Sequence, residues 1–211
     1  MNILIINNQA VDSLFGQQIP FGQATFITRQ ELPQNAELLY DLVIDFEFEE
    51  HTERTKIYAS FTKPVLIGSV LYALSELNLQ NSNIARFNHW PFFKDRNCIE
   101  FFCTTTNDQL FTGIFNQLNI TSHKTADVPG FVSARVIANI INEAFFAEGE
   151  QVSSKEEIDT AMKLGTNYPY GPFEWSREIG VEKTMLLLQK IAVDDNRYEP
   201  SPNLLKELNF L

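Results

Sequence analysis

The pattern of the sequence changes near residue 126, and this change limits what the chain can fold into. Before it, short apolar runs alternate with stretches of helical periodicity, whereas from Asp127 onward only helical patterns follow. Strands that alternate with helices predict a mostly parallel sheet covered by helices, and a run of helices alone predicts a separate bundle. We therefore predict an α/β domain over residues 1–126 and an all-α domain over residues 127–211.

The first half contains the elements that a parallel sheet requires. Its first apolar run, residues 2–6, ends in two asparagines, as a buried strand would. Residues 9–23 are ambiguous because Gly and Pro residues interrupt them, and residues 47–53 form an acidic stretch that favours a helix. The remaining elements predicted here are strands at residues 24–28, 42–46, 56–61, 83–87 and 99–103, and helices at residues 65–77 and 108–118.

The second half carries helix signals of several kinds. Apolar residues recur every four positions over residues 131–148, which indicates one buried face of a helix. Ser154 and Glu157 have the spacing of a capping box and predict that the next helix begins there, and Gly165 predicts its end. Further signals are a rigid turn at Pro169, Gly171 and Pro172, a helix over residues 181–192, and a closing helix after Pro202.

Composition narrows the partners and the compartment. The formal net charge is −11 and no run of Lys or Arg occurs, so binding to nucleic acid or to an anionic membrane is disfavoured. No basic segment precedes the first apolar run, and we therefore expect this run to be neither a signal peptide nor a membrane span. Cys98 and Cys103 fall on opposite faces of a predicted strand, and the three histidines are scattered, so we expect no disulfide and no metal site. These features predict a cytoplasmic protein.

Several short segments of the second half match a known pattern in both order and spacing. They are Asp127-Val-Pro-Gly-Phe-Val-Ser-Ala-Arg135, Phe146-Ala-Glu-Gly149, Ile158-Asp-Thr-Ala-Met-Lys-Leu-Gly165, Pro169-Tyr-Gly-Pro-Phe-Glu174, Ile179-Gly-Val and Tyr198-Glu-Pro-Ser-Pro202. Together they resemble the C-terminal domain of 3-hydroxyacyl-CoA dehydrogenases. The resemblance implies a shortened Rossmann-like parallel-sheet domain before it, fatty-acid or acyl-CoA metabolism, and a homodimer formed through the helical domain.

The resemblance also implies NAD as the cofactor, but the sequence departs from the family where NAD would bind. The turn after the first strand reads Asn-Asn-Gln-Ala, and Gly16 is the first glycine, which is too late for the tight turn that approaches the pyrophosphate. Glu31 is the nearest candidate for the acidic partner of the ribose. The stretch before residue 42 is short by one strand and one helix. No cofactor-binding residue is assigned.

The catalytic pair is carried over from weaker matches upstream, at residues 41–50, 57–62 and 84–100. Glu100 matches the carboxylate that orients the catalytic histidine in the family. An ungapped count places the histidine position at Asn88, and the neighbouring His89 would point to the other face of the strand. A bulge or a deletion would bring His89 back, so His89 and Glu100 are the candidate catalytic pair.

Other substrate-contacting positions are changed as well. The family's Asn-Thr-Ser after the strand matched to residues 57–60 reads Phe-Thr-Lys here, which puts Lys63 at the position of the orienting serine. Ala134 takes the place of an asparagine, and Glu49 matches an acidic residue near the site. The candidate substrate-binding residues are therefore Lys63, Asn88 and Glu49.

Three hypotheses follow from these residues. The chain is a degenerate dehydrogenase homologue that retains binding of an acyl-CoA, or an active NAD-dependent enzyme with a rebuilt nucleotide site and His89 as its base. In the third, it is a non-catalytic dimeric interaction protein. NADH binding separates the second from the others, and acyl-CoA binding separates the first from the third.

Overall fold

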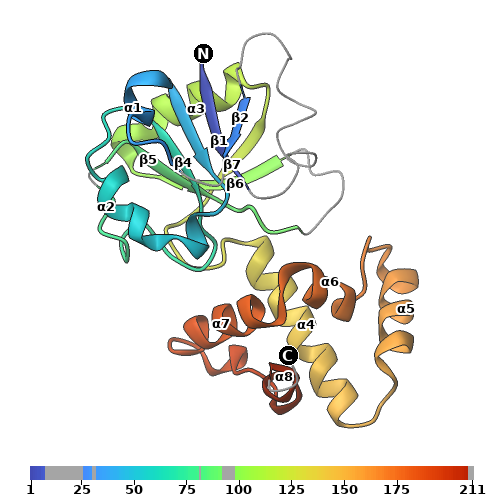
Figure 1. Cartoon of the computed structure of the whole chain (residues 1–211). Coiled ribbons are helices and arrows are strands. Elements are labelled where there is room, and N and C mark those ends of the chain that lie inside the picture. Colours follow the sequence, from blue (N-terminus) through green and yellow to red (C-terminus); the bar gives the residue numbers. More distant parts are fainter. Residues whose placement is uncertain (8–25, 30–31, 81, 92–97, 209–211) are drawn as a thin grey trace. The chain divides into compact units, whose positions relative to one another are not determined.

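The computed structural model describes residues 1–7, 26–29, 32–80, 82–91 and 98–208 (Figure 1). The chain divides into two compact units. The first, called here the α/β unit, contains Met1–His89 and Asp95–Phe131, and the second, the helical unit, contains Trp90–Lys94 and Val132–Leu211. The predicted boundary after Ala126 lies inside the α/β unit.

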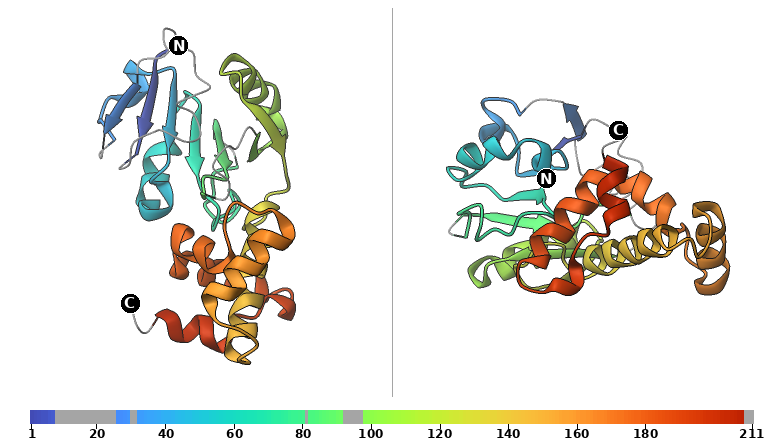
Figure 2. Two further views of the ribbon diagram at one scale, coloured as in Figure 1. Left: turned by 90° about the vertical axis from the view of Figure 1, so that its right-hand side faces the viewer. Right: turned by 90° about the horizontal axis from the view of Figure 1, so that it is seen from below.

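The α/β unit is built on one sheet of seven strands in the order β2-β1-β3-β4-β5-β6-β7 (Figure 2). Neighbouring strands are parallel except for β5 and β6. This confirms the predicted mostly parallel sheet. The strands are β1 (Ile3–Ile6), β2 (Phe26–Arg29), β3 (Leu42–Asp45), β4 (Val65–Gly68), β5 (Ile84–Phe87), β6 (Cys98–Cys103) and β7 (Thr121–Lys124).

Continuous apolar runs form the central strands because helices and turns cover both faces of the sheet. Every residue of β1, β3, β4 and β5 is buried. Ile3 and Ile5 pack in one core cluster with Phe111 and Phe115 of α3 (Asp108–Gln117). Leu4 and Ile6 pack in a second cluster with residues of α1 (Ala36–Leu39) and α2 (Thr55–Tyr58). Side chains that alternate along a strand thus supply two cores.

Two predicted elements of the α/β unit are wrong. Residues 56–61, predicted as a strand, form the end of helix α2 and a turn, after two 3-10 helices, η1 (Phe48–Glu50) and η2 (Thr52–Arg54). Residues 65–77, predicted as a helix, begin as strand β4 and continue as turns. A short apolar run cannot be assigned to helix or strand by periodicity alone. The run that starts at Val65 forms a strand because it pairs in parallel with both β3 and β5.

The other predicted strands and the helix over residues 108–118 are present. Strand β7 was not predicted, because its sequence Thr-Ser-His-Lys has no apolar face and it lies at the edge of the sheet. The ambiguous residues 9–23 lie outside the described residues. Cys98 and Cys103 are both free thiols on β6.

The helical unit contains α4 (Ser133–Gly149), α5 (Lys155–Thr166), α6 (Pro172–Ile179), α7 (Val181–Ala192), η4 (Asn196–Tyr198) and α8 (Pro202–Leu208). The capping box of Ser154 and Glu157 is confirmed at the start of α5. Gly165 does not end this helix. Asn167 does so in the left-handed conformation (φ 58°), which asparagine tolerates better than most residues. The predicted turn before α6 includes Pro172, which is the first residue of that helix. No helix in the described part of the chain is both long and apolar enough to cross a membrane.

Candidate functional site

The candidate site lies at the carboxyl ends of the central strands. Strands β3, β4 and β5 are parallel, so the residues that follow them come to the same edge of the sheet. Glu49 comes from η1 after β3, Ser69 follows β4, and Asn88 and His89 follow β5. Ligands of open parallel sheets bind at this edge.

Asn88 and Glu100 are held together by the pairing of β5 with β6. The register matches Phe87 with Phe101, so Asn88 stands opposite Glu100 without a bulge. The buried Asn88 donates through Nδ2 to Glu100 Oε2 at 2.8 Å, and its backbone N–H donates to the Glu100 carbonyl at 2.9 Å. The ungapped count thus gives the position that faces Glu100, and a carboxamide occupies it.

His89 lies with a different carboxylate, that of Glu49. The distance from His89 Nε2 to Glu49 Oε2 is 3.7 Å, and the two side chains are 9% and 1% exposed. A Cβ atom at Gly68 would lie 2.9 Å from the ring atoms Cγ and Nδ1 of His89, so the imidazole fits only because residue 68 is glycine. The structure therefore places the predicted base His89 with Glu49.

Glu49 also ties the turn after β4 to the site. Its Oε1 atom accepts hydrogen bonds from the backbone N–H groups of Val70 and Leu71, the second at 2.5 Å. A buried carboxylate is stabilised by such bonds, because backbone amides replace the water that it has lost. Of the residues proposed from the sequence, Glu49, Asn88, His89 and Glu100 all come from this edge of the sheet.

Lys63 does not belong to this group. The strand that was matched to residues 57–60 is a helix, and Lys63 is an exposed residue just before β4, at the opposite end of that strand. The same three-residue count taken after β4 reaches Ser69, Val70 and Leu71. Leu71, the third residue after β4, is 6% exposed. Ala134 is buried in α4.

Arg86 and Asp127 were not singled out from the sequence, although they form a charge pair in which the arginine is fully buried and the aspartate is 15% exposed. Arg86 Nε donates to Asp127 Oδ1 at 2.9 Å, and its terminal nitrogens donate to the carbonyls of Ser69 and Val128. Its guanidinium carbon lies 4.1 Å from the centre of the Phe131 ring. The signal in the sequence was an arginine inside the apolar strand Ile-Ala-Arg-Phe, since a charge there requires a partner.

A second buried group fixes the segment that carries Glu49. Asp45, the last residue of β3, accepts two bonds from Arg54 Nη1, both at 3.0 Å, and one from the Tyr58 hydroxyl at 2.7 Å. Burial raises the pKa of Asp45, while the bonds from Tyr58 and Arg54 act in the opposite direction. Burial beside this carboxylate also raises the pKa of Tyr58. The group anchors η2 and α2 and thereby the preceding η1.

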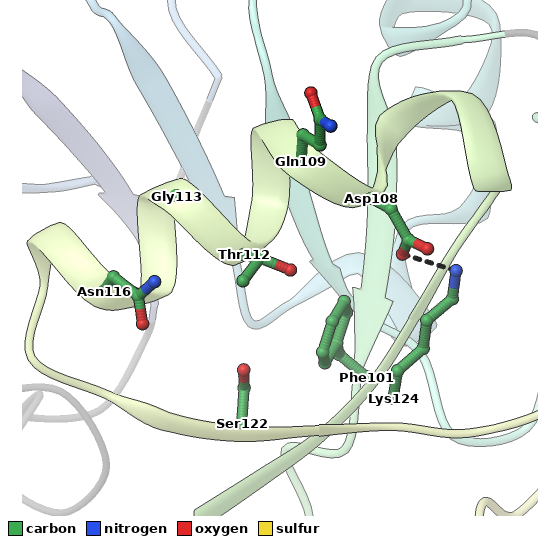
Figure 3. A pocket seen from close by; sticks show the side chains of 8 residues that line it. All are labelled: Phe101, Asp108, Gln109, Thr112, Gly113, Asn116, Ser122 and Lys124. Carbon is green, nitrogen blue, oxygen red and sulfur yellow. Dashed lines mark hydrogen bonds and ion pairs between the residues drawn. The ribbon is translucent and has the colours of Figure 1, made fainter.

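A separate hollow of about 590 Å³ lies between α3 and β7 (Figure 3). Its lining includes Thr112, Gly113, Asn116 and Ser122, with an ion pair of 2.5 Å between Lys124 and Asp108 at one end. The hydrogen bond from Lys124 lowers the pKa of Asp108. None of Glu49, Asn88, His89 and Glu100 lines it. Among the described residues, no group of three His, Cys, Asp or Glu side chains could hold a metal ion.

The comparisons with known proteins agree with this fold. Residues 130–209 match the model of the C-terminal domain of 3-hydroxyacyl-CoA dehydrogenase. A 3-hydroxyadipyl-CoA dehydrogenase of Escherichia coli is 44% identical over 88 residues, which cover 41% of this chain and 18% of that protein. The mitochondrial hydroxyacyl-coenzyme A dehydrogenase of Homo sapiens is 30% identical over 163 residues, which cover 74% of this chain and 50% of that protein.

A solved structure gives the same result. The (S)-3-hydroxybutyryl-CoA dehydrogenase of Ralstonia eutropha superposes with a TM-score of 0.73 at 21% identity, over 89% of this chain and 70% of that one. The chain belongs to the 3-hydroxyacyl-CoA dehydrogenase family. It spans at most half the length of the two curated relatives.

Proposed function

We propose that this chain is a 3-hydroxyacyl-CoA dehydrogenase-like protein of acyl-CoA metabolism in which NAD-dependent hydride transfer is impaired or lost and binding of an acyl-CoA is retained. The observation that carries the proposal is the pair of Asn88 and Glu100, joined by a hydrogen bond of 2.8 Å. Oxidation of a 3-hydroxyl group requires a base for its proton, and a carboxamide does not accept a proton near neutral pH. Loss of a general base costs roughly 10²–10⁴-fold in rate.

The residues present at the cofactor end support the same proposal. NAD is the cofactor that the family implies, and its pyrophosphate requires a glycine-rich turn at the end of the first strand. Asn7 follows β1 directly, and no glycine occurs before Gly16 in the sequence. These residues do not fit the family's way of holding a dinucleotide, and we propose that NAD binding is weakened or lost.

The pair of His89 and Glu49 favours an alternative function, an active dehydrogenase in which His89 is the base. A carboxylate beside an imidazole fixes its orientation and stabilises its charged form. The separation of 3.7 Å between His89 Nε2 and Glu49 Oε2 is longer than a hydrogen bond, and His89 is almost completely buried. For these two reasons we rank this alternative below the proposal that rests on Asn88.

A non-catalytic dimeric protein is the third reading. Exposed apolar side chains at the start of α4 and on it support this reading: Val132, the residue before the helix, is 56% exposed, Val136 52% and Phe146 36%. Val132 and Val136 are four residues apart and so lie on one side of the helix, where a second helical unit would cover them. We propose a homodimer through the helical unit for all three readings.

The test combines ligand binding with turnover. Thermal unfolding is measured with NADH and, separately, with acetoacetyl-CoA, because a ligand at a hundred times its Kd adds about 2.7 kcal/mol to stability. Reduction of acetoacetyl-CoA is followed by the absorbance of NADH. We expect stabilisation by acetoacetyl-CoA alone and no turnover above background.

Variants separate the readings. Turnover that disappears in His89→Ala, but not in His123→Ala on exposed strand β7, would establish the alternative enzyme and overturn the proposal. Stabilisation by neither ligand, together with a dimer in sedimentation equilibrium, would leave the interaction protein. Asn88→His restores the family's residue opposite Glu100 and is expected to increase any residual turnover.

A further inference from the structure

The turn after β4, residues 69–71, contacts both segments through which the chain leaves the α/β unit. The first exit follows β5, where the unit ends at His89 and the chain continues at Trp90. The second follows Phe131, where the chain continues into α4. The contacts of this turn with both exits lie inside the α/β unit.

The turn meets the first exit through Glu49. The carboxylate accepts from the N–H groups of Val70 and Leu71 with Oε1, and its Oε2 atom lies 3.7 Å from Nε2 of His89, the last residue before the exit. The ring of His89 is packed against Gly68, the residue before the turn. One buried side chain therefore joins the turn to the end of β5.

The turn meets the second exit through its carbonyl groups. The carbonyl of Val70 accepts from the N–H of Gly130 at 2.7 Å, and the carbonyl of Ser69 accepts from Arg86 Nη1 at 3.2 Å. Arg86 in turn binds Asp127 and lies over the ring of Phe131. Gly130 and Phe131 both have positive φ, 86° and 50°. The strained conformation of Phe131 requires support from its surroundings, and these bonds supply it.

We propose that residues 69–71 act as a latch, held in place by Glu49, that fixes both exits of the chain from the α/β unit. Glu49 accepts hydrogen bonds from the N–H groups of Val70 and Leu71. The carbonyl groups of Ser69 and Val70 accept from Arg86 and Gly130, which hold the second exit. Loss of the Glu49 carboxylate removes the acceptor of the N–H groups of Val70 and Leu71, and the turn then loosens its hold on Gly130. The proposal does not depend on whether the chain turns over a substrate.

Amide hydrogen exchange, followed residue by residue by NMR, tests this latch without any ligand. In Glu49→Ala we expect the amide of Gly130 to exchange at least about tenfold faster, because the partner of its hydrogen bond is no longer held. The amide of Ile120, which donates to the Phe115 carbonyl at 2.8 Å in the same unit, is expected to keep its rate. Glu53→Ala removes an exposed carboxylate of the neighbouring segment, which lies 3.2 Å from His51 Nδ1, and it serves as the matched control.

Three outcomes are distinguishable. Faster exchange at Gly130 with Ile120 unchanged supports the latch. Faster exchange at Val70 and Leu71 with Gly130 unchanged overturns it, because the turn then does not transmit the loss. If Ile120 also exchanges faster in Glu49→Ala, the unit has been destabilised as a whole. Two results must then hold for the proposal to stand: Gly130 is accelerated more than Ile120 in Glu49→Ala, and Glu49→Gln, which keeps an acceptor of the same shape, returns Gly130 towards its original rate.

Discussion

The two units of the molecule satisfy their buried polar groups in different ways. In the helical unit, buried side chains bind the backbone: Asn142 donates to the carbonyl of Glu199 and accepts from the N–H of Ser201, both at 2.8 Å. In the α/β unit, buried side chains bind the backbone too, but several of them also bind each other as charged pairs, such as Arg86 with Asp127 and Arg54 with Asp45. A side chain that binds backbone fixes a loop, whereas a charge pair joins elements that are far apart in the sequence.

This difference determines where each unit is vulnerable. Removal of one partner from a buried pair leaves an uncompensated charge, which costs more than the pair itself contributes. Removal of a side chain that binds backbone leaves neutral groups without partners, which costs less for each group. The α/β unit should therefore be the more sensitive of the two to substitution of a single buried polar residue.

The largest effect is expected for Arg86→Met. Methionine fills similar space but leaves the Asp127 carboxylate without its buried partner and the carbonyls of Ser69 and Val128 without a donor. Breaking a buried pair in this way costs about 3–5 kcal/mol, to be measured by urea unfolding.

The control for this variant is Arg197→Met. Arg197 forms a close pair with Asp195 at 2.5 Å, but its side chain is 81% exposed, so solvent screens the pair and we expect no resolvable loss of stability. If the two variants lose equal stability, burial does not set the cost and the comparison between the units fails.

The helical unit could be predicted in more detail because its signals are local. The capping box needs only Ser154 and Glu157, three residues apart, and the structure confirms it. A local signal misleads where a second signal of the same kind follows it closely. Gly165 predicts the end of this helix, but the helix continues to Thr166 and Asn167 caps it.

The candidate site in the α/β unit could be predicted only in part. The residue opposite Glu100 followed from counting along two strands, because the register of a pair without a bulge is fixed. The partner of His89 did not follow, since Glu49 is 40 positions away and comes from a different strand end. Lys63 was misplaced because the apolar run at residues 65–68 was predicted as a helix, although it is a strand. Contacts between residues far apart in the sequence decide which side chains meet and which runs become strands. The local pattern of a single sequence does not specify these contacts.

The intermediate effect is expected for Asn142→Ala in the helical unit. The substitution leaves the carbonyl of Glu199 and the N–H of Ser201 without their partner, and the bond to Ser201 is buried. Each unsatisfied buried group costs about 1–3 kcal/mol, so urea unfolding should show a total loss of roughly 2–3 kcal/mol. Asn196→Ala, at an exposed position of η4, should change stability by less than about 0.5 kcal/mol. A loss from Asn142→Ala as large as that from Arg86→Met would remove the distinction between the units.

The smallest effect is expected at the surface of the helical unit, where Glu174 combines both kinds of contact. It accepts from Lys163 Nζ at 2.5 Å and from the N–H of Gly171 at 2.8 Å, and these two bonds hold the pKa of Glu174 below its ordinary value. A carboxylate with a lowered pKa stabilises the fold fully above the pKa that it has in the unfolded chain, and this contribution is lost as the pH falls through the lower pKa of the folded state. The partial exposure of both side chains, 35% for Lys163 and 29% for Glu174, limits the effect to less than about 1 kcal/mol.

Urea unfolding of the native chain and of Glu174→Gln between neutral and acid pH should therefore show a small difference that disappears in acid. Lys163→Met should remove most of this pH dependence, because the bond from Lys163 is the larger cause of the shift. If the pH dependence persists in Lys163→Met, the backbone of Gly171 holds the carboxylate, and Glu174 then follows the same rule as the buried polar residues of its unit.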